Sequence, residues 1–175
     1  MKPFSVQRLG VILAAILGLG LLFAAQPASA TVSGIAFSVD KKTAKPGDQL
    51  TLTLSLTNTE TSDIFFAYEF IQPTWPSNQA TGIYTVVGCS GDTVDCTTNG
   101  NNANFHFLAP IAPGATRTVT LTVQISPNWP GNTSTSTLNW APYVHYEFGQ
   151  VNGPSTARDE GYYSGLPELQ TTIGV

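Results

Sequence analysis

The sequence is poor in the residue types that build catalytic and metal centres. Its 175 residues include two cysteines, two histidines and one methionine, and charged residues make up only 10% of the chain. A blue-copper site needs two histidines, a free cysteine and usually a methionine, and the only methionine here is Met1. No Gly-x-Ser-x-Gly sequence is present, and nothing in the sequence brings a serine nucleophile and an acid to either histidine. We therefore predict no catalytic residues, no metal and no cofactor.

One long apolar run occurs, and it lies at the N-terminus. Two basic residues fall within the first eight, residues 9–25 are apolar, and the small residues Ala28-Ser29-Ala30 follow. This order predicts a secretory signal peptide at residues 1–30, cleaved before Thr31. No later run approaches the roughly eighteen apolar residues of a membrane-spanning helix. We expect a secreted mature domain, residues 31–175, without a transmembrane segment, located in the periplasm, on the cell surface or in the medium.

Charge excludes two classes of partner. Removal of the signal leaves five basic residues against eleven acidic ones, so the mature net charge is −6. Nucleic acid and anionic membrane surfaces attract basic proteins, and neither is an expected partner.

Alternation of apolar and polar residues predicts β-strands. Residues 50–57 place leucine at one parity and hydroxyl residues at the other, and residues 118–125 repeat the pattern. No segment of ten or more residues keeps a helical period. Weaker strand patterns bring the total to about eight, as expected for an all-β sandwich, at residues 35–39, 64–70, 83–89, 103–108, 138–148 and 169–173.

The connections between these strands carry turn and loop residues. Lys45-Pro46-Gly47-Asp48 and Ala112-Pro113-Gly114 predict tight turns, because proline presets φ and glycine tolerates positive φ. Segments rich in Pro, Gly, Ser, Thr and Asn predict loops at residues 72–79, 126–136 and 149–165.

The cysteine pair predicts a disulfide. Cys89 and Cys96 lie on the exported part of the chain, six residues intervene, and further cysteine ligands for zinc are absent. Their spacing allows them to face each other across a hairpin that turns near Asp92-Thr93. Closure of so short a loop is worth about 2.5 kcal/mol in the chain-entropy model.

Strand parity places both histidines away from the core. His106 alternates with Phe105 and Phe107, and His145 lies opposite the apolar row that contains Trp140 and Val144. We expect both imidazole rings to face solvent. An enzyme would require a cleft that unites one of them with a carboxylate.

Four aspartates near turns leave calcium as an alternative. Carboxylates at turns are hard oxygen ligands for Ca²⁺, although aspartate is also a favoured turn residue and no Asp-x-Asp-x-Asp-Gly run occurs. The four are Asp40, Asp48, Asp92 and Asp95.

Aromatic residues in loops are the main sign of a ligand. Trp75 and Trp129 each precede a proline, and Tyr162-Tyr163 lie in the glycine-rich segment near the end. Exposed rings on loops stack on sugar faces. The alternative is that the rings fold back and close the ends of the sandwich.

The order of these motifs resembles the conserved-repeat, immunoglobulin-like modules of bacterial cell-surface and secreted proteins. The resemblance spans residues 38–144 and rests on short motifs: Pro46-Gly47-Asp48, Thr57-Asn58-Thr59, residues 112–116 leading into the strand at 119–123, and Asn139-Trp140-Ala141. Glu60 stands where the family usually has glycine. The resemblance implies a single immunoglobulin-like antiparallel β-sandwich of seven to eight strands.

The same resemblance implies a non-catalytic role with no active-site residues. We expect a structural, adhesive or protein-binding module at or outside the cell envelope. Its partner is then an extracellular or envelope protein. The alternative is a carbohydrate-binding module that binds polysaccharide through Trp75, Trp129, Tyr162 and Tyr163.

Overall fold

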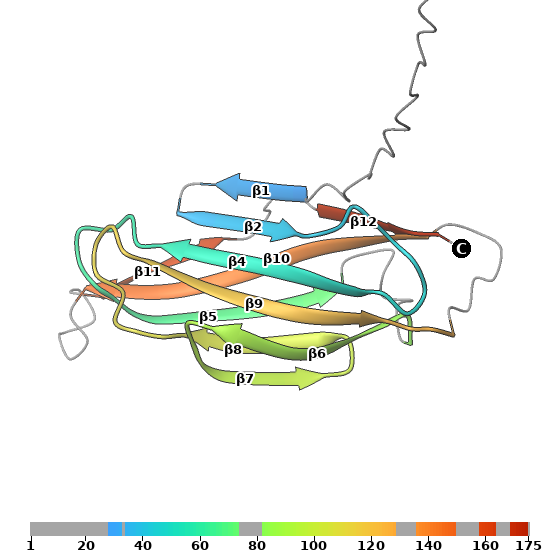
Figure 1. The fold of residues 1–175 in the computed structure, drawn as a ribbon. Coiled ribbons are helices and arrows are strands. Elements are labelled where there is room, and N and C mark those ends of the chain that lie inside the picture. The colour runs from blue at the N-terminus through green and yellow to red at the C-terminus, as the bar shows by residue number, and fades with distance from the viewer. Residues whose placement is uncertain are drawn as a thin grey trace, which may run out of the picture.

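The fold is an all-β sandwich of two sheets (Figure 1). The structure is a computed structural model, and it describes residues 28–32, 34–73, 82–128, 136–149, 158–163 and 169–174. Within these ranges every regular element is a strand. No helix in this part of the chain is long and apolar enough to cross a membrane.

The first sheet has five antiparallel strands in the order β1-β2-β4-β9-β6. Its centre is the pairing of β4 with β9, in which Leu50, Leu52 and Leu54 oppose Val123, Leu121 and Val119. The strands are β1 (Ala28–Val32), β2 (Ile35–Val39), β4 (Gln49–Thr57), β9 (Thr116–Ile125) and β6 (Tyr84–Gly91).

The second sheet has seven strands, in the order β3-β12-β10-β5-β8-β7, with β11 paired to β10. All its pairs are antiparallel except β3 with β12. The strands are β3 (Thr43–Ala44), β12 (Leu169–Ile173), β10 (Ser136–Gly149), β5 (Ile64–Pro73), β8 (Asn102–Phe107), β7 (Thr93–Asn99) and β11 (Arg158–Tyr163).

The core lies between the sheets and is formed by the predicted inward rows. The inward leucines of β4 and the inward aliphatic residues of β9 are at most 1% exposed. From the opposite sheet come the rings of Phe105, Phe107 and Trp140, which are equally buried. The Trp140 Nε1–H donates to Thr171 Oγ1 at 3.0 Å, so the polar edge of this ring is satisfied inside the core.

All eight strands predicted from the sequence are present, and residues 35–39 and 169–173 match β2 and β12 at both ends. Four strands were not predicted: β1, β3, β7 and β11. Because of them the sandwich has more strands than expected and one parallel pair. The strand β1 includes Ala28-Ser29-Ala30, which pair with Val39, Ser38 and Phe37, so it spans the predicted cleavage site. Signal cleavage itself stays a prediction.

Asn58, from the Thr-Asn-Thr motif, links the end of β4 to the turn that precedes β9. Its side chain is buried, and its Nδ2 donates to the carbonyl oxygens of Ser62 at 2.8 Å and Ile111 at 2.7 Å. Its Oδ1 accepts from the Glu60 backbone N–H at 2.8 Å. The Glu60 carboxylate in turn accepts from the Tyr146 hydroxyl at 2.8 Å, so the residue that differs from the family pattern joins the two sheets.

We predict that Asn58→Asp destabilises the fold by about 3 kcal/mol. The carboxylate would lose two donated hydrogen bonds and would face two carbonyl oxygens in a buried position. Chemical denaturation measures the change, and Asn101→Asp, at a partly exposed position before β8, is the control. Equal stabilities of the two variants would show that the Asn58 amide contributes nothing.

For two core tyrosines we predict that removal of the hydroxyl changes the stability of the protein in opposite directions. The Tyr84 hydroxyl is buried without a hydrogen-bond partner in the part of the chain that the structure describes, and burial raises the pKa of this phenol above its usual range. We expect Tyr84→Phe to stabilise the protein by about 1 kcal/mol, because a buried unpaired polar group is removed. Tyr146→Phe should cost about 1 kcal/mol, because it removes the bond to Glu60.

The measurement is the free energy of unfolding at neutral and at alkaline pH. Because the pKa of Tyr84 is raised in the folded state, its titration leaves the free energy of unfolding unchanged below about pH 10, the pKa of an unfolded tyrosine. Above that pH the unfolded state loses the proton first, so the free energy of unfolding falls. The Tyr84→Phe substitution should therefore lessen the alkaline loss of stability. A destabilised Tyr84→Phe variant would contradict this interpretation.

Candidate functional site

The outer face of the seven-stranded sheet carries a row of residues from five strands. Register places Tyr162 of β11 opposite His145 of β10, and His145 opposite Tyr68 of β5. Tyr68 lies opposite His106 of β8, which lies opposite Asp95 of β7. This histidine row brings together residues that are up to 94 positions apart in the sequence.

Two histidine–carboxylate pairs flank one aromatic ring on this face. His106 Nδ1 lies 3.6 Å from Asp95 Oδ2, and His145 Nε2 lies 3.5 Å from Glu147 Oε1. The Phe66 ring contacts both imidazoles edge to face, with centroid distances of 5.2 Å and 5.9 Å. Both histidines lie away from the core, as parity predicts. His145 is nevertheless only 17% exposed, because Phe66 covers it.

An open pocket of about 340 Å³ lies beside His106. Its walls are mainly apolar and its one acidic group is Asp95. It is formed where β5, β7 and β8 meet, by Phe65, Phe66, Ala67, Val94, Asp95, His106, Phe107 and Ala109. We refer to these residues as the β7 pocket.

Two β-bulges supply side chains to the β7 pocket. In β5, Ile64 and Phe66 pair with consecutive residues of β10, so Phe65 is the extra residue. In β7, Thr93 and Asp95 pair with consecutive residues of β8, so Val94 is the extra residue. A bulge redirects side chains and increases local twist. The two bulges therefore place Phe65 and Val94 at the same pocket.

The sequence did not predict Phe65, Phe66 or Val94 as site residues. The available signal was the lone apolar Val94 among polar neighbours. Because bulges depend on the partner strand, their positions could not be read from the sequence alone.

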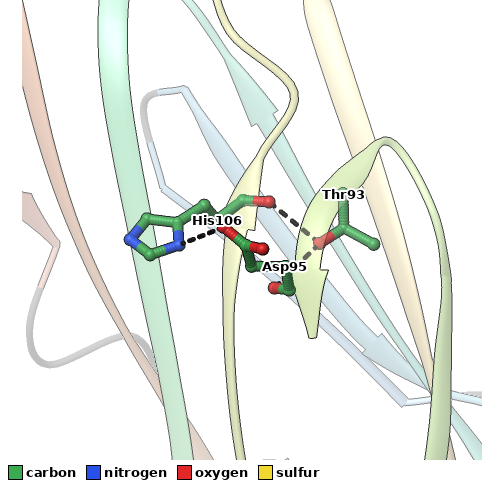
Figure 2. A network of polar contacts seen from close by, with 3 residues as sticks. All are labelled: Thr93, Asp95 and His106. Atoms are coloured by element: carbon green, nitrogen blue, oxygen red, sulfur yellow. Dashed lines mark hydrogen bonds and ion pairs between the residues drawn. The ribbon is translucent and has the colours of Figure 1, made fainter. Parts of the chain in front are cut away.

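At the polar end of the pocket the His106 imidazole lies beside the Asp95 carboxylate, and Thr93 lies nearby on β7 (Figure 2). Thr93 Oγ1 donates to the His106 carbonyl oxygen at 2.9 Å, and the Asp95 carbonyl oxygen lies 3.3 Å away. Both carbonyls belong to the backbone, so the Thr93 hydroxyl fixes the β7–β8 pairing. The arrangement offers a hydrogen-bonding and acidic end to an apolar pocket.

The chain reaches β7 by crossing from one sheet to the other at Gly91-Asp92. Gly91 has a φ of +99°, and a Cβ there would collide with the Thr118 carbonyl oxygen. The Asp92 backbone N–H donates to that carbonyl at 2.8 Å, and the Asp92 carboxylate accepts from the Thr118 N–H at 2.9 Å. The Leu108 N–H donates to the Asp92 carbonyl at 2.8 Å. The crossing is thus hydrogen-bonded to β9 of one sheet and to the residue that follows β8 of the other.

The predicted disulfide between Cys89 and Cys96 is confirmed, with a Cα–Cα distance of 6.2 Å. The expected hairpin is wrong, because β6 pairs with β9 in one sheet and β7 pairs with β8 in the other. The backbone crosses the edge of the sandwich between the two cysteines (Figure 1). The disulfide therefore links the sheets beside the β7 pocket.

The four aspartates considered for calcium do not gather. Asp40 accepts from the Thr51 N–H at 2.8 Å, Asp48 from the Lys45 N–H at 2.9 Å, and Asp92 from Thr118. These are the roles of turn residues. Asp95 lies at His106 instead. In the described ranges no three His, Cys, Asp or Glu residues are grouped to hold a metal ion.

The predicted aromatic site is only partly described. Trp75 and Trp129 lie outside the described residues. Tyr162 and Tyr163, expected in a loop, belong to β11. The expectation of a loop was wrong because β12 pairs only with residues 136–140 of β10. The remaining edge of β10, from Val144 to Gly149, pairs with β11.

Comparison with known proteins supports the fold. No protein-family model and no curated sequence matches the chain. The structure is similar to the seventh type I cohesin of ScaB from Pseudobacteroides cellulosolvens, with a TM-score of 0.50 and 9% identity over 76% of this chain and 87% of that one. At this identity the similarity shows the fold alone, an immunoglobulin-like sandwich.

Two further structures score lower. A cohesin module of a family 33 glycoside hydrolase from Clostridium perfringens has a TM-score of 0.48 and 9% identity, over 81% of this chain and 96% of that one. The collagen-binding subdomain ACE19 of an Enterococcus faecalis surface protein has a TM-score of 0.43 and 13% identity, over 79% and 96%.

We predict that Gly91→Ala destabilises the protein by at least about 2 kcal/mol, since it adds a side chain at positive φ against backbone. Gly88→Ala is the matched control on the same strand, where a Cβ would meet no atom within 4 Å. It should change stability by no more than about 0.5 kcal/mol. Denaturation of both oxidised proteins provides the comparison, and equal midpoints would contradict the role given to Gly91.

Proposed function

We propose that this protein is an exported, non-catalytic immunoglobulin-like module that binds an extracellular or envelope protein at the β7 pocket. The observation that carries the proposal is an open apolar pocket of about 340 Å³ on the outer face of a sheet. A spacer would need no such concavity. Apolar clefts with a few polar groups are typical of binding sites.

Exposed apolar side chains gather around this pocket. Val94 is 58% exposed and lines it, and Leu108, between the lining residues Phe107 and Ala109, is 42% exposed. Exposed apolar groups that lie together mark interaction surfaces more often than single ones do. A protein surface that covers the pocket would remove both side chains from water.

Export is supported by independent features of the sequence. A basic, apolar and small-residue order at residues 1–30 is typical of a signal peptide. The Cys89–Cys96 disulfide is the kind of bond that persists outside the cytoplasm. The resemblance to bacterial surface modules favours a structural, adhesive or protein-binding role.

Polysaccharide is the second candidate ligand. One observation favours it: Tyr162 lies in the histidine row, opposite His145, on the sheet that also carries the β7 pocket. In this alternative Trp75 and Trp129, which lie outside the described residues, supply further rings, while register places Tyr163 opposite Val144 and not in the histidine row.

The test is selection of binding peptides followed by a matched pair of substitutions. A random dodecapeptide display library is selected on the oxidised, exported protein. The selected peptides are then measured against Val94→Asn and Val87→Asn. Val87 is the matched control, because it is 53% exposed and is the extra residue of a bulge in β6, outside the lining of the pocket.

We expect Val94→Asn to weaken the selected peptides about tenfold, since a polar amide would enter the apolar wall, and Val87→Asn to leave them unchanged. Equal binding to both variants would place the site elsewhere and overturn the proposal. A second result would also overturn the proposal. In it the library yields no enriched peptide, and polysaccharide causes a saturable change of tryptophan fluorescence that Trp75→Ala or Trp129→Ala abolishes. That result would support the second candidate.

A further inference from the structure

The β7 pocket combines an apolar body with an acidic end. Phe65, Phe66 and Val94 form its walls, and Asp95, 76% exposed at its side chain, provides the only carboxylate in the lining. A ligand that fits both parts has a long apolar stem and a terminal positive charge. Among protein side chains, only lysine and arginine have this form.

The Phe66 ring adds a second preference for a cation. It lines the pocket and meets the imidazoles of His106 and His145 edge to face. An aromatic face attracts a cation, more often arginine than lysine. The guanidinium group is also planar, so it can stack on a ring and bind a carboxylate through two N–H groups.

The charge of the surroundings agrees with this ligand. Among the described residues that line the pocket there is no lysine or arginine. Arg117 contacts the turn that follows β8, where its Nε and Nη2 donate to the carbonyl oxygens of Leu108 at 3.0 Å and Pro110 at 3.3 Å. Its hydrogen bonds thus go to the backbone of that turn. The whole chain is acidic, with a net charge of −4, which favours a basic partner.

Exposed residues near the pocket indicate which residues of the partner flank the inserted basic side chain. Val94 is an exposed aliphatic side chain of the lining, and Leu108, also exposed, lies in the sequence between the lining residues Phe107 and Ala109. Apolar residues on either side of the inserted side chain would cover them, because this contact removes apolar area from water.

We infer that the β7 pocket receives a basic side chain, arginine in preference to lysine, from a partner segment in which apolar residues flank it. The inference rests on the proposed function and names the chemistry of its partner. Asp95 binds the guanidinium group, Phe66 stacks against it, and Val94 and Leu108 contact the flanking residues.

The experiment is a backbone-amide NMR titration with four short peptides. They are acetyl-Leu-X-Leu-amide, in which X is arginine, lysine, norleucine or glutamate. Each is added to the oxidised wild-type protein, to Asp95→Asn and to Glu147→Gln. Glu147 is the matched control, because it pairs with the other histidine of the row and does not line the pocket.

We expect saturable shifts at the amides of Val94, Asp95 and His106 with the arginine peptide. The order of affinity should be arginine, lysine, norleucine and then glutamate. Asp95→Asn should weaken the arginine peptide about fivefold, the loss that an exposed ion pair produces, and Glu147→Gln should leave it unchanged. Added salt should weaken the arginine peptide and spare the norleucine peptide.

The outcomes separate this inference from the proposed function. If the norleucine peptide shifts the pocket amides at the same concentrations as the arginine peptide, the pocket binds apolar groups, and only the inference is overturned. Unchanged binding to Asp95→Asn overturns it in the same way. If none of the four peptides shifts these amides, the inference is also overturned. The proposed function is decided separately, by the peptides selected without regard to sequence and the Val94→Asn variant.

Discussion

The pairing of β4 with β9 is the constraint on which the sandwich depends. Nine consecutive register pairs join residues 59 to 75 positions apart. Leucine, valine and isoleucine fill the inward side, and hydroxyl side chains such as Ser55 and Thr118 bond across the outer side. A slip of one residue would turn the whole inward row to water. This register also fixes Thr118 beside the Gly91-Asp92 crossing, and through that crossing it fixes the start of β7.

Sequence pattern predicted the strands in which buried and exposed residues alternate and missed strands without that signal, such as β7. Periodicity identified β4 and β9 because their two faces differ in polarity. By contrast, nearly all of β7 is exposed, and the region of β11 reads as a polar, glycine-rich loop. Each forms because a neighbouring edge, on β8 or on β10, offers backbone partners. The partner strands belong to other segments of the chain, and the periodicity of one segment does not indicate which strand pairs with it.

The candidate site was predictable only in part for the same reason. Alternation with Phe105 and Phe107 placed His106 on the outer face. Asp95 was identified as polar and close to a turn, but its proximity to His106 depends on the register between β7 and β8. The pocket itself comes from extra residues in two strands. Bulges of this kind interrupt the alternation that sequence analysis uses. The bulges that form the pocket are therefore difficult to predict from the sequence.

The position of the disulfide has a consequence for assembly. Cys89 and Cys96 are seven residues apart, whereas β4 and β9 must close a loop of about sixty residues or more. The entropic cost of closure rises with loop length, so the short bridge can form before the long-range pairs. Once closed, it holds the ends of β6 and β7 at the corner where the chain changes sheets. Oxidation of the two cysteines therefore restricts the unfolded chain to conformations that already contain this corner, and long-range strand pairing starts from a smaller set of topologies.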